Sequence, residues 1–248
     1  MDYLKRISVR NWRDYRSGAL LALAMWVSFA MWISWDRAAE LRSAVTASST
    51  LAETLAANTR QVLGVAELVA AVVASEVQTH GPDVDLKRMQ ARGLLYSAIF
   101  LQVAVTDRSG MLRASSLPRN GPVNLSDRDH IRVHLDGVWP RDRLFISAPV
   151  TGRVSGQVSI QMTRAIVDEG GELIGIVTLS VAPSYFTDLY KLLDIGTLGM
   201  VTVIGTNDNI VRARRTSAGE ALGDELGASN NLREMIQRDA SGSFRANS

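Results

Sequence analysis

The chain has 248 residues, a net charge of +2 and a hydrophobic content of 46%, which fits one full domain with an accessory part. Its 27 basic residues are spread along the chain, so the sequence lacks the basic stripe of a nucleic-acid-binding protein. It has no cysteine, which excludes disulfides, thiolate metal sites and cysteine nucleophiles.

The first predicted element is a membrane-spanning helix over residues 18–35, which read GALLALAMWVSFAMWISW without a charge. Such a helix covers about 27 Å, close to the ~30 Å hydrocarbon core of a bilayer. Trp12, Trp32 and Trp35 lie near its ends, where indole rings favour the interface. Five basic residues precede it, so the positive-inside rule predicts a cytoplasmic segment 1–17 and a single-pass inner-membrane protein with its bulk in the periplasm. A cleaved signal peptide and a buried core helix are the alternatives.

The second predicted element is a long stalk helix over residues 36–80. Residues 36–79 contain no proline and one glycine, and apolar positions recur at spacings of three and four. Gly81 and Pro82 end the pattern. One face of this helix is therefore expected to be buried, against its own domain or against a second copy, and we expect a homodimer through it.

The segment 83–193 is predicted to form an α+β unit, in which turns such as Asp107-Arg-Ser-Gly110 join antiparallel strands. Ser126 is the expected N-cap of its middle helix. The expected helices cover 84–96, 127–135 and 183–193, and the expected strands cover 99–106, 111–115, 144–150, 157–167 and 173–181.

A second unit over 197–248 is predicted because the strand-turn-strand pattern begins again. AVTDRSGMLRAS from Ala104 is echoed by VIGTNDNIVRAR from Val203. Strands are expected over 200–204 and 210–214, followed by a helix over 231–239 and the start of a strand at Gly242. This unit is shorter than the first, so we expect it to be incomplete.

The stretches LSDRDHIRVH, LFISAPVTGRVSGQVSIQMTRAI and GELIGIVTLSVAPSYFTDLY, all between Leu125 and Tyr190, resemble the double Cache (PDC, PAS-like) extracytoplasmic sensors of bacterial receptors. The resemblance implies a ligand-holding membrane-distal unit at 83–193 and a membrane-proximal unit at 197–248. It also implies a second transmembrane helix and a diguanylate cyclase, phosphodiesterase or histidine kinase output domain, which this sequence lacks. The amino-acid-binding signature of some members, a Tyr with an Arg and a downstream Trp-Tyr, does not occur, which leaves the ligand open.

Inward-pointing polar groups on the sheet and its covering helix would hold a ligand in this fold. Arg128 and Arg132, four residues apart, could grip a carboxylate or phosphate, so an anionic small molecule is one expected partner. The alternatives are a solvated sheet face for the strand residues and plain solvent exposure for the arginines. The candidates are Arg128, His130, Arg132 and His134 on the helix, Phe145 and Ser147 on one strand, and Ser159, Gln161 and Thr163 on the next.

The spacing of His130 and His134 leaves two further alternatives, a metal site and a pH-responsive pair. No third metal ligand is evident, so no metal or cofactor is expected. The loop 152–156 is expected to be a turn, because it lacks the phosphate-binding pattern GxxxxGK[ST].

Catalysis is not expected from this chain. Gly170-Gly171-Glu172-Leu173 lacks the end of the GGDEF motif of diguanylate cyclases, and no Gly-x-Ser-x-Gly elbow occurs. The sequence therefore predicts an extracytoplasmic ligand-sensing module. The alternative is a membrane-anchored periplasmic interaction or structural module without a small-molecule ligand.

Overall fold

The computed structural model describes residues 3–96, 98–191, 199–216 and 219–223. The chain separates into two units, of which one contains residues 1–56 and the other is formed by residues 57–235. The helix expected over 231–239 and the strand expected from Gly242 lie outside the described residues.

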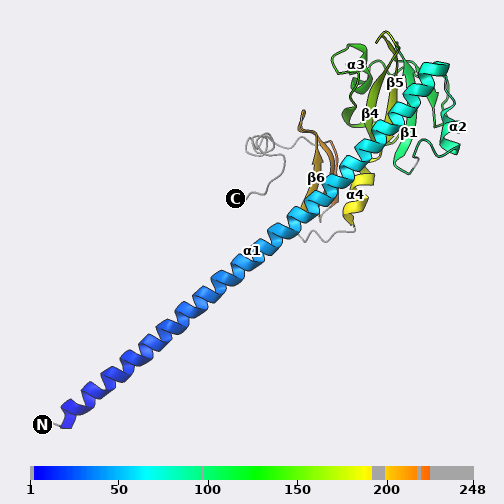
Figure 1. Cartoon of the computed structure of the whole chain (residues 1–248). Coiled ribbons are helices and arrows are strands. Elements are labelled where there is room, and N and C mark those ends of the chain that lie inside the picture. Colours follow the sequence, from blue (N-terminus) through cyan, green and yellow to red (C-terminus); the bar gives the residue numbers. More distant parts are fainter. Residues whose placement is uncertain (1–2, 97, 192–198, 217–218, 224–248) are drawn as a thin grey trace. The chain divides into compact units, whose positions relative to one another are not determined.

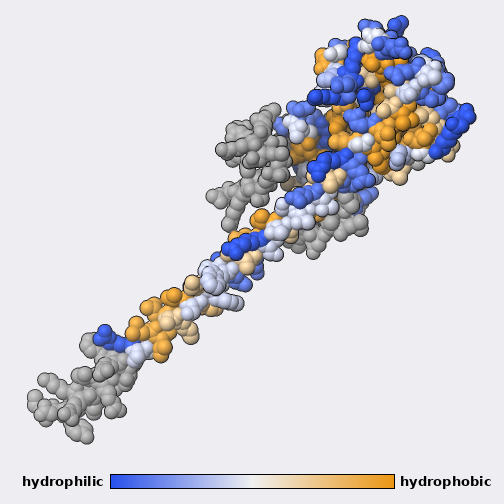
Figure 2. Space-filling view, in the orientation of Figure 1, coloured by the Kyte–Doolittle hydropathy of each residue, from blue (hydrophilic) through white to orange (hydrophobic). Residues whose placement is uncertain are grey.

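Helix α1 runs without a break over Tyr3–His80 (Figure 1). Within the described residues it is the one helix long and apolar enough to cross a membrane, and none of its apolar window is buried. Trp26 and Trp35, for example, are 66% and 69% exposed, and Figure 2 shows hydrophobic side chains gathered on this stretch. The buried-core-helix alternative for residues 18–35 is therefore wrong.

A five-stranded antiparallel sheet forms the centre of the second unit, with the strand order β2-β1-β5-β4-β3. This order joins the hairpins β1–β2 and β4–β5 through the pairing of β1 with β5, and it confirms the predicted α+β fold with a PAS-like sheet. The strands are β1 (Phe100–Asp107), β2 (Leu112–Ser115), β3 (Phe145–Thr151), β4 (Val158–Val167) and β5 (Leu173–Val181).

The two faces of this sheet have different covers. The end of α1 crosses one face (Figure 1), where Glu67 pairs with Arg164 of β4 at 3.0 Å and the side-chain amide of Gln78 donates to the carbonyl of Val167. On the opposite face helix α3 (Asp129–Leu135) places Ile131 in an apolar cluster with Ala104, Leu112, Leu125 and Ile176. Side chains on both faces of β4 and β5 are therefore buried.

Three sequence-based helix details are corrected by the structure. Helix α2 covers only Leu86–Ala91, because Asp85 caps its start and Gly93, at a positive φ of 77°, follows its end. Helix α3 begins at Asp129 with Arg128 at the cap position and no side-chain cap hydrogen bond. The predicted cap at Ser126 is therefore wrong, and the backbone amide of Ser126 donates to the side chain of Asn124 in a turn before the helix.

Helix α4 (Pro183–Lys191) follows β5, and a second antiparallel sheet then has the strand order β6-β7-β8. Its strands are β6 (Met200–Ile204), β7 (Val211–Thr216) and β8 (Gly219–Ala221). The hairpin β6–β7 agrees with the predicted repeat of the strand-turn-strand pattern. The short strand β8 was not predicted from the sequence.

Candidate functional site

The sheet face under α3 is polar and buried. Cross-strand pairing places Gln161 opposite Ser180, Thr163 opposite Thr178, and Gln102 opposite Ser180 on its other side. Residues at alternate positions of a strand share a face, so these side chains line one surface. All are buried, together with Ser147 and Ser159, so the alternative of a solvated sheet face is wrong.

Hydrogen bonds link the polar side chains of this floor to one another. The hydroxyl of Ser180 donates to Gln161 Oε1 at 2.7 Å, and Gln161 Nε2 donates to Ser159 Oγ at 2.7 Å. The backbone amide of Gln161 donates to Ser147 Oγ at 3.0 Å, where the β3–β4 register shifts between Ile146 and Pro149. The Ser147 hydroxyl thus accepts the hydrogen bond that a backbone carbonyl of β3 would accept in a regular β3–β4 pair, and this bond fixes the position of Gln161.

His130 and His134 descend from α3 onto this floor. The Thr163 hydroxyl donates its proton to the carbonyl of His130 at 2.8 Å. His134 Nε2 lies 2.9 Å from the oxygen of this hydroxyl, and because the hydroxyl proton is already used, Nε2 must be the donor to Thr163 Oγ1. The remaining nitrogen, His134 Nδ1, is buried and has no partner among the described residues. Protonation there would place a charge beside the edge-on ring of Phe145.

Burial lowers the pKa of each imidazole to about 4, and the neighbouring Arg128 adds to the effect on His130. Both rings are therefore neutral at neutral pH, which argues against the alternative of a pH-responsive pair near pH 7. No group of three or more metal-ligating side chains gathers anywhere in the described part of the chain.

A small cavity of about 30 Å³ lies between the floor, α3 and the loop that follows β3. Thr178 lines this cavity and is only 4% exposed, and its buried hydroxyl has no hydrogen-bond partner among the described residues. A buried, unpaired hydroxyl costs about 1–3 kcal/mol, which a bound polar group could offset. The lining residues are Gln102, Ala104, Leu125, Arg128, His130, Val150, Thr151, Gly152, Arg153, Val154, Gln161, Thr178 and Ser180.

Two arginines contribute to the rim of the cavity and differ in their pairing. Arg153 forms two hydrogen bonds with the carboxylate of Asp127, at 3.0 and 2.8 Å, and so ties the loop 152–156 to the segment before α3. The same hydrogen bonds hold the pKa of Asp127 below its usual range. Among the described residues Arg128 makes one long side-chain bond, 3.3 Å to the carbonyl of Thr151, which leaves most of its guanidinium donors for a ligand.

The structure brings most of the predicted site residues together. Arg128, His130 and Gln161 line the cavity, while Ser147, Ser159, Thr163 and His134 support it from the same buried face. Arg132 instead points to solvent, 57% exposed and paired with Asp129 at 2.7 Å. Phe145 packs edge-on against Trp139 and His134 and does not line the cavity.

Five polar lining residues were missed from the sequence: Gln102 on β1, Thr151 at the end of β3, Thr178 and Ser180 on β5, and Arg153 in the loop. The signal for Thr178 and Ser180 was present, because hydroxyl side chains at alternate positions interrupt an otherwise apolar strand. Gln102 carried no such signal, since a single polar residue near the start of a strand is common at a sheet edge.

Two larger hollows near β2, of about 520 and 350 Å³, are open to solvent and share Arg113 and Arg119. Both arginines have partners within the fold. Arg113 pairs with Asp83 at 2.5 Å, and Arg119 donates to the carbonyls of Leu112 and Arg113. Arg119 thereby covers carbonyls of the edge strand β2 and Arg113 is neutralised by Asp83, so the smaller, less open cavity is the better candidate for a ligand.

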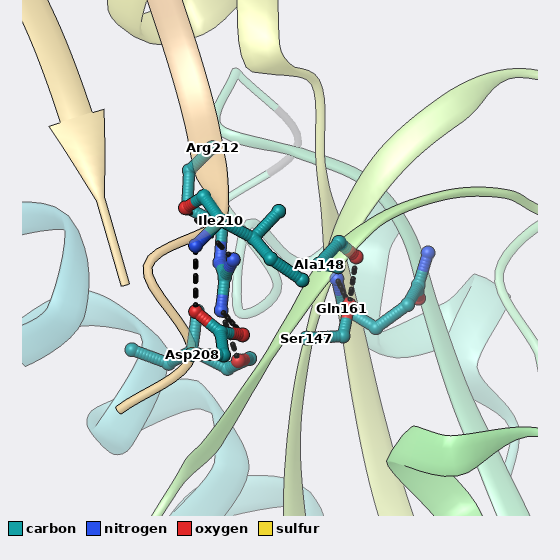
Figure 3. A network of polar contacts seen from close by, with 7 residues as sticks. Ser147, Ala148, Gln161, Asp208, Ile210 and Arg212 are labelled. Atoms are coloured by element: carbon teal, nitrogen blue, oxygen red, sulfur yellow. Dashed lines mark hydrogen bonds and ion pairs between the residues drawn. The ribbon is translucent and has the colours of Figure 1, made fainter. Parts of the chain in front are cut away.

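The floor is also connected to the second sheet (Figure 3). Arg212 of β7 is 7% exposed at its side chain and pairs with Asp208 at 2.7 Å. Its guanidinium donates to the carbonyl of Ile146, the residue before Ser147, at 3.3 Å. The irregular stretch of β3 thus bonds with Gln161 through Ser147 and with the β6–β7 hairpin through Ile146.

No protein-family model matches this sequence, and no curated protein matches it. Among solved structures, the extracellular domain of the proposed histidine kinase rpHK1S-Z16 is similar over 77% of each chain, with a TM-score of 0.66 and 22% identity. The ligand-binding domain of the Pseudomonas fluorescens chemoreceptor CtaA, in complex with L-isoleucine, is similar over 71% of this chain and 70% of its own, with a TM-score of 0.52 and 15% identity. An extracellular ligand-binding receptor from Desulfohalobium retbaense has a TM-score of 0.51 and 14% identity, over 76% of this chain and 34% of its own. The described part of this chain therefore has the fold of the Cache (PDC-like) extracytoplasmic sensor domains.

Proposed function

We propose that this chain is the extracytoplasmic ligand-sensing module of a bacterial transmembrane receptor. The observation that carries the proposal is the buried polar floor beneath α3, where Thr178, whose hydroxyl has no partner among the described residues, lines a partly enclosed cavity. A domain built only for stability gains more from apolar side chains at such positions. The polar groups therefore favour a bound molecule.

The anchor and the fold support a sensing role as part of a receptor. The apolar, exposed stretch of α1 would hold the chain in the inner membrane, with residues 1–17 in the cytoplasm and the sensing unit in the periplasm. Two copies would pair through the stalk part of α1. The output would be of the diguanylate cyclase, phosphodiesterase or histidine kinase type, and sensing itself would need no catalysis by this chain.

A membrane-anchored interaction module without a small-molecule ligand is the second candidate. Its support is the volume of the cavity, about 30 Å³, which exceeds the ~10–15 Å³ that a cavity needs to hold one water molecule. Under this alternative the floor would be satisfied by one ordered water, and a protein partner would bind elsewhere.

Ligand-induced stabilisation distinguishes the two candidates. The full chain, purified in a non-ionic detergent, would be screened by thermal shift against small acids, amines, neutral polar compounds and nucleotides. A ligand-sensing module is expected to show a saturable rise in Tm with one class. The variant Thr178→Val, which removes the unpaired hydroxyl with little change in shape, should weaken that rise. A folded chain that responds to no class would contradict the ligand-sensing proposal.

A further inference from the structure

We infer that the cavity beneath α3 takes a short carboxylate without an amino group, in the range from acetate to butyrate and including their hydroxy and keto forms. This inference rests on the proposed ligand-sensing function and names the chemical class of the ligand. Three observations carry it: the charges around the cavity, the groups on its floor, and its size.

The charges favour an anion and disfavour an ammonium group. Two arginines line the cavity. Arg128 makes a single long side-chain bond among the described residues and so has guanidinium N–H groups for a ligand, while Arg153 is already paired with the carboxylate of Asp127. Within the described part of the chain no aspartate or glutamate lines the cavity, and His130 is neutral at neutral pH because burial lowers its pKa to about 4. A carboxylate would gain a bidentate partner here, whereas an α-ammonium group would lose its hydration with no counter-charge.

The floor offers hydrogen bonds to the rest of a short acid. The buried Thr178 hydroxyl has no hydrogen-bond partner in the part of the chain that the structure describes. Gln102 uses its amide nitrogen on Ser115 at 3.0 Å, which leaves its oxygen as an acceptor. Thr178 can donate to a keto group, and Gln102 can accept from a ligand hydroxyl. The apolar walls from Ala104, Leu125, Val150 and Val154 suit a methyl or ethyl group.

The small size of the cavity favours a short chain, because a longer ligand would displace the loop 152–156 further. Drug-sized ligands occupy pockets of about 300–1,000 Å³, an order of magnitude more than the roughly 30 Å³ here. Even a short acid requires the loop 152–156 to move outward. Arg153 ties this loop to the carboxylate of Asp127 and the carbonyl of Asn124, so these hydrogen bonds would break for entry and re-form over a ligand that fits beneath the loop.

Matched ligand pairs test the inference directly. The full chain in detergent would be titrated calorimetrically with propionate, lactate, alanine and propylamine at neutral pH. We expect saturable binding of lactate or propionate, and at least about tenfold weaker binding of alanine, which differs from lactate by an ammonium group in place of a hydroxyl.

Two arginines on neighbouring turns provide the variant and its control. Arg128→Gln should weaken carboxylate binding by about 10- to 100-fold, the value of a charge-assisted hydrogen-bond pair. Arg132→Gln removes an equal charge from the exposed side of α3 and should leave affinity unchanged. The Tm of each unliganded variant verifies that it is folded.

The outcomes separate this inference from the proposed function. Alanine binding as tightly as lactate, or equal losses in the two arginine variants, would overturn the short-carboxylate inference. Saturable binding of a neutral or cationic compound that is lost in Thr178→Val would also overturn it and would leave the sensing proposal standing. A folded chain that binds no compound of any class would contradict both.

Discussion

The two buried histidines make the stability of this fold sensitive to acid. Each imidazole has a folded-state pKa of about 4, below the ordinary value of 6.5, because burial disfavours its charged form. Between these values the unfolded chain binds protons that the folded chain does not, so stability is complete above pH 6.5 and is lost as the pH falls towards 4. We predict that replacing either ring with a neutral amide flattens this dependence.

The magnitude follows from the two pKa values. Between about pH 7.5 and about pH 5, one imidazole shifted from 6.5 to about 4 removes about 2 kcal/mol from the free energy of unfolding. Single domains are stable by about 5–15 kcal/mol, so the two rings together account for a substantial fraction. His134→Gln is the better variant, because its amide nitrogen can replace Nε2 as the donor to Thr163.

The assay is urea unfolding of the full chain in detergent, with the free energy of unfolding measured at both pH values. From the higher to the lower pH, the free energy of unfolding of the wild type should fall by about 2 kcal/mol more than that of His134→Gln. The third histidine of the chain, His80, has a 62% exposed side chain, and His80→Gln supplies the matched control. If His134→Gln and the control show the same pH dependence, burial does not govern the titration of His134 and the reasoning fails.

Three substitutions test other parts of the fold by the same unfolding measurement at neutral pH. Arg212→Met should lower the free energy of unfolding by about 2–3 kcal/mol, because it removes the bond to the carbonyl of Ile146 and leaves Asp208, at 38% exposure, without its ion-pair partner. A loss below about 0.5 kcal/mol, typical of an ordinary surface site, would contradict this. Gly175→Ala should cost about 2 kcal/mol or more, because its new Cβ would lie 2.7 Å from the carbonyl oxygen of Thr106 in the paired strand. Gly64→Ala, on the exposed side of α1 with open space around it, should instead stabilise by up to about 1 kcal/mol; an opposite sign for either glycine variant would contradict these packing assignments.

Elements with strong local signals were predictable from the sequence. The strand over 173–181 has its predicted bounds, because turn residues precede it and a proline that starts α4 follows it. The turn at Asp107–Gly110 was also clear, and the Asp107 carboxylate accepts from the amides of Ser109 and Met111 there. In both cases the residues that define the element lie within it or within a few residues of its ends.

Details that depend on competition between neighbouring residues were not predictable. Ser126 is a good N-cap residue, yet Asn124 takes its backbone amide in a turn, and α3 starts three residues after Ser126. Arg128 and Arg132 share a spacing that predicts one helix face. Because Arg128 sits at the cap and Arg132 finds Asp129 on the outer surface, only Arg128 reaches the cavity.

The polar alternation of β4 shows what a period of two can and cannot specify. It separates Ser159, Gln161 and Thr163 from Ile160 and Met162, but it does not say which set is covered, and in a one-sided sheet the polar set would face water. The decisive residues lie on the adjacent strand. Strand β5 is apolar enough to be covered on both faces, so its hydroxyls must be buried, and antiparallel pairing then buries their neighbours on β4 as well. Polar residues inside a doubly covered strand are therefore a better sequence signal for this cavity than the arginine and histidine spacings of α3.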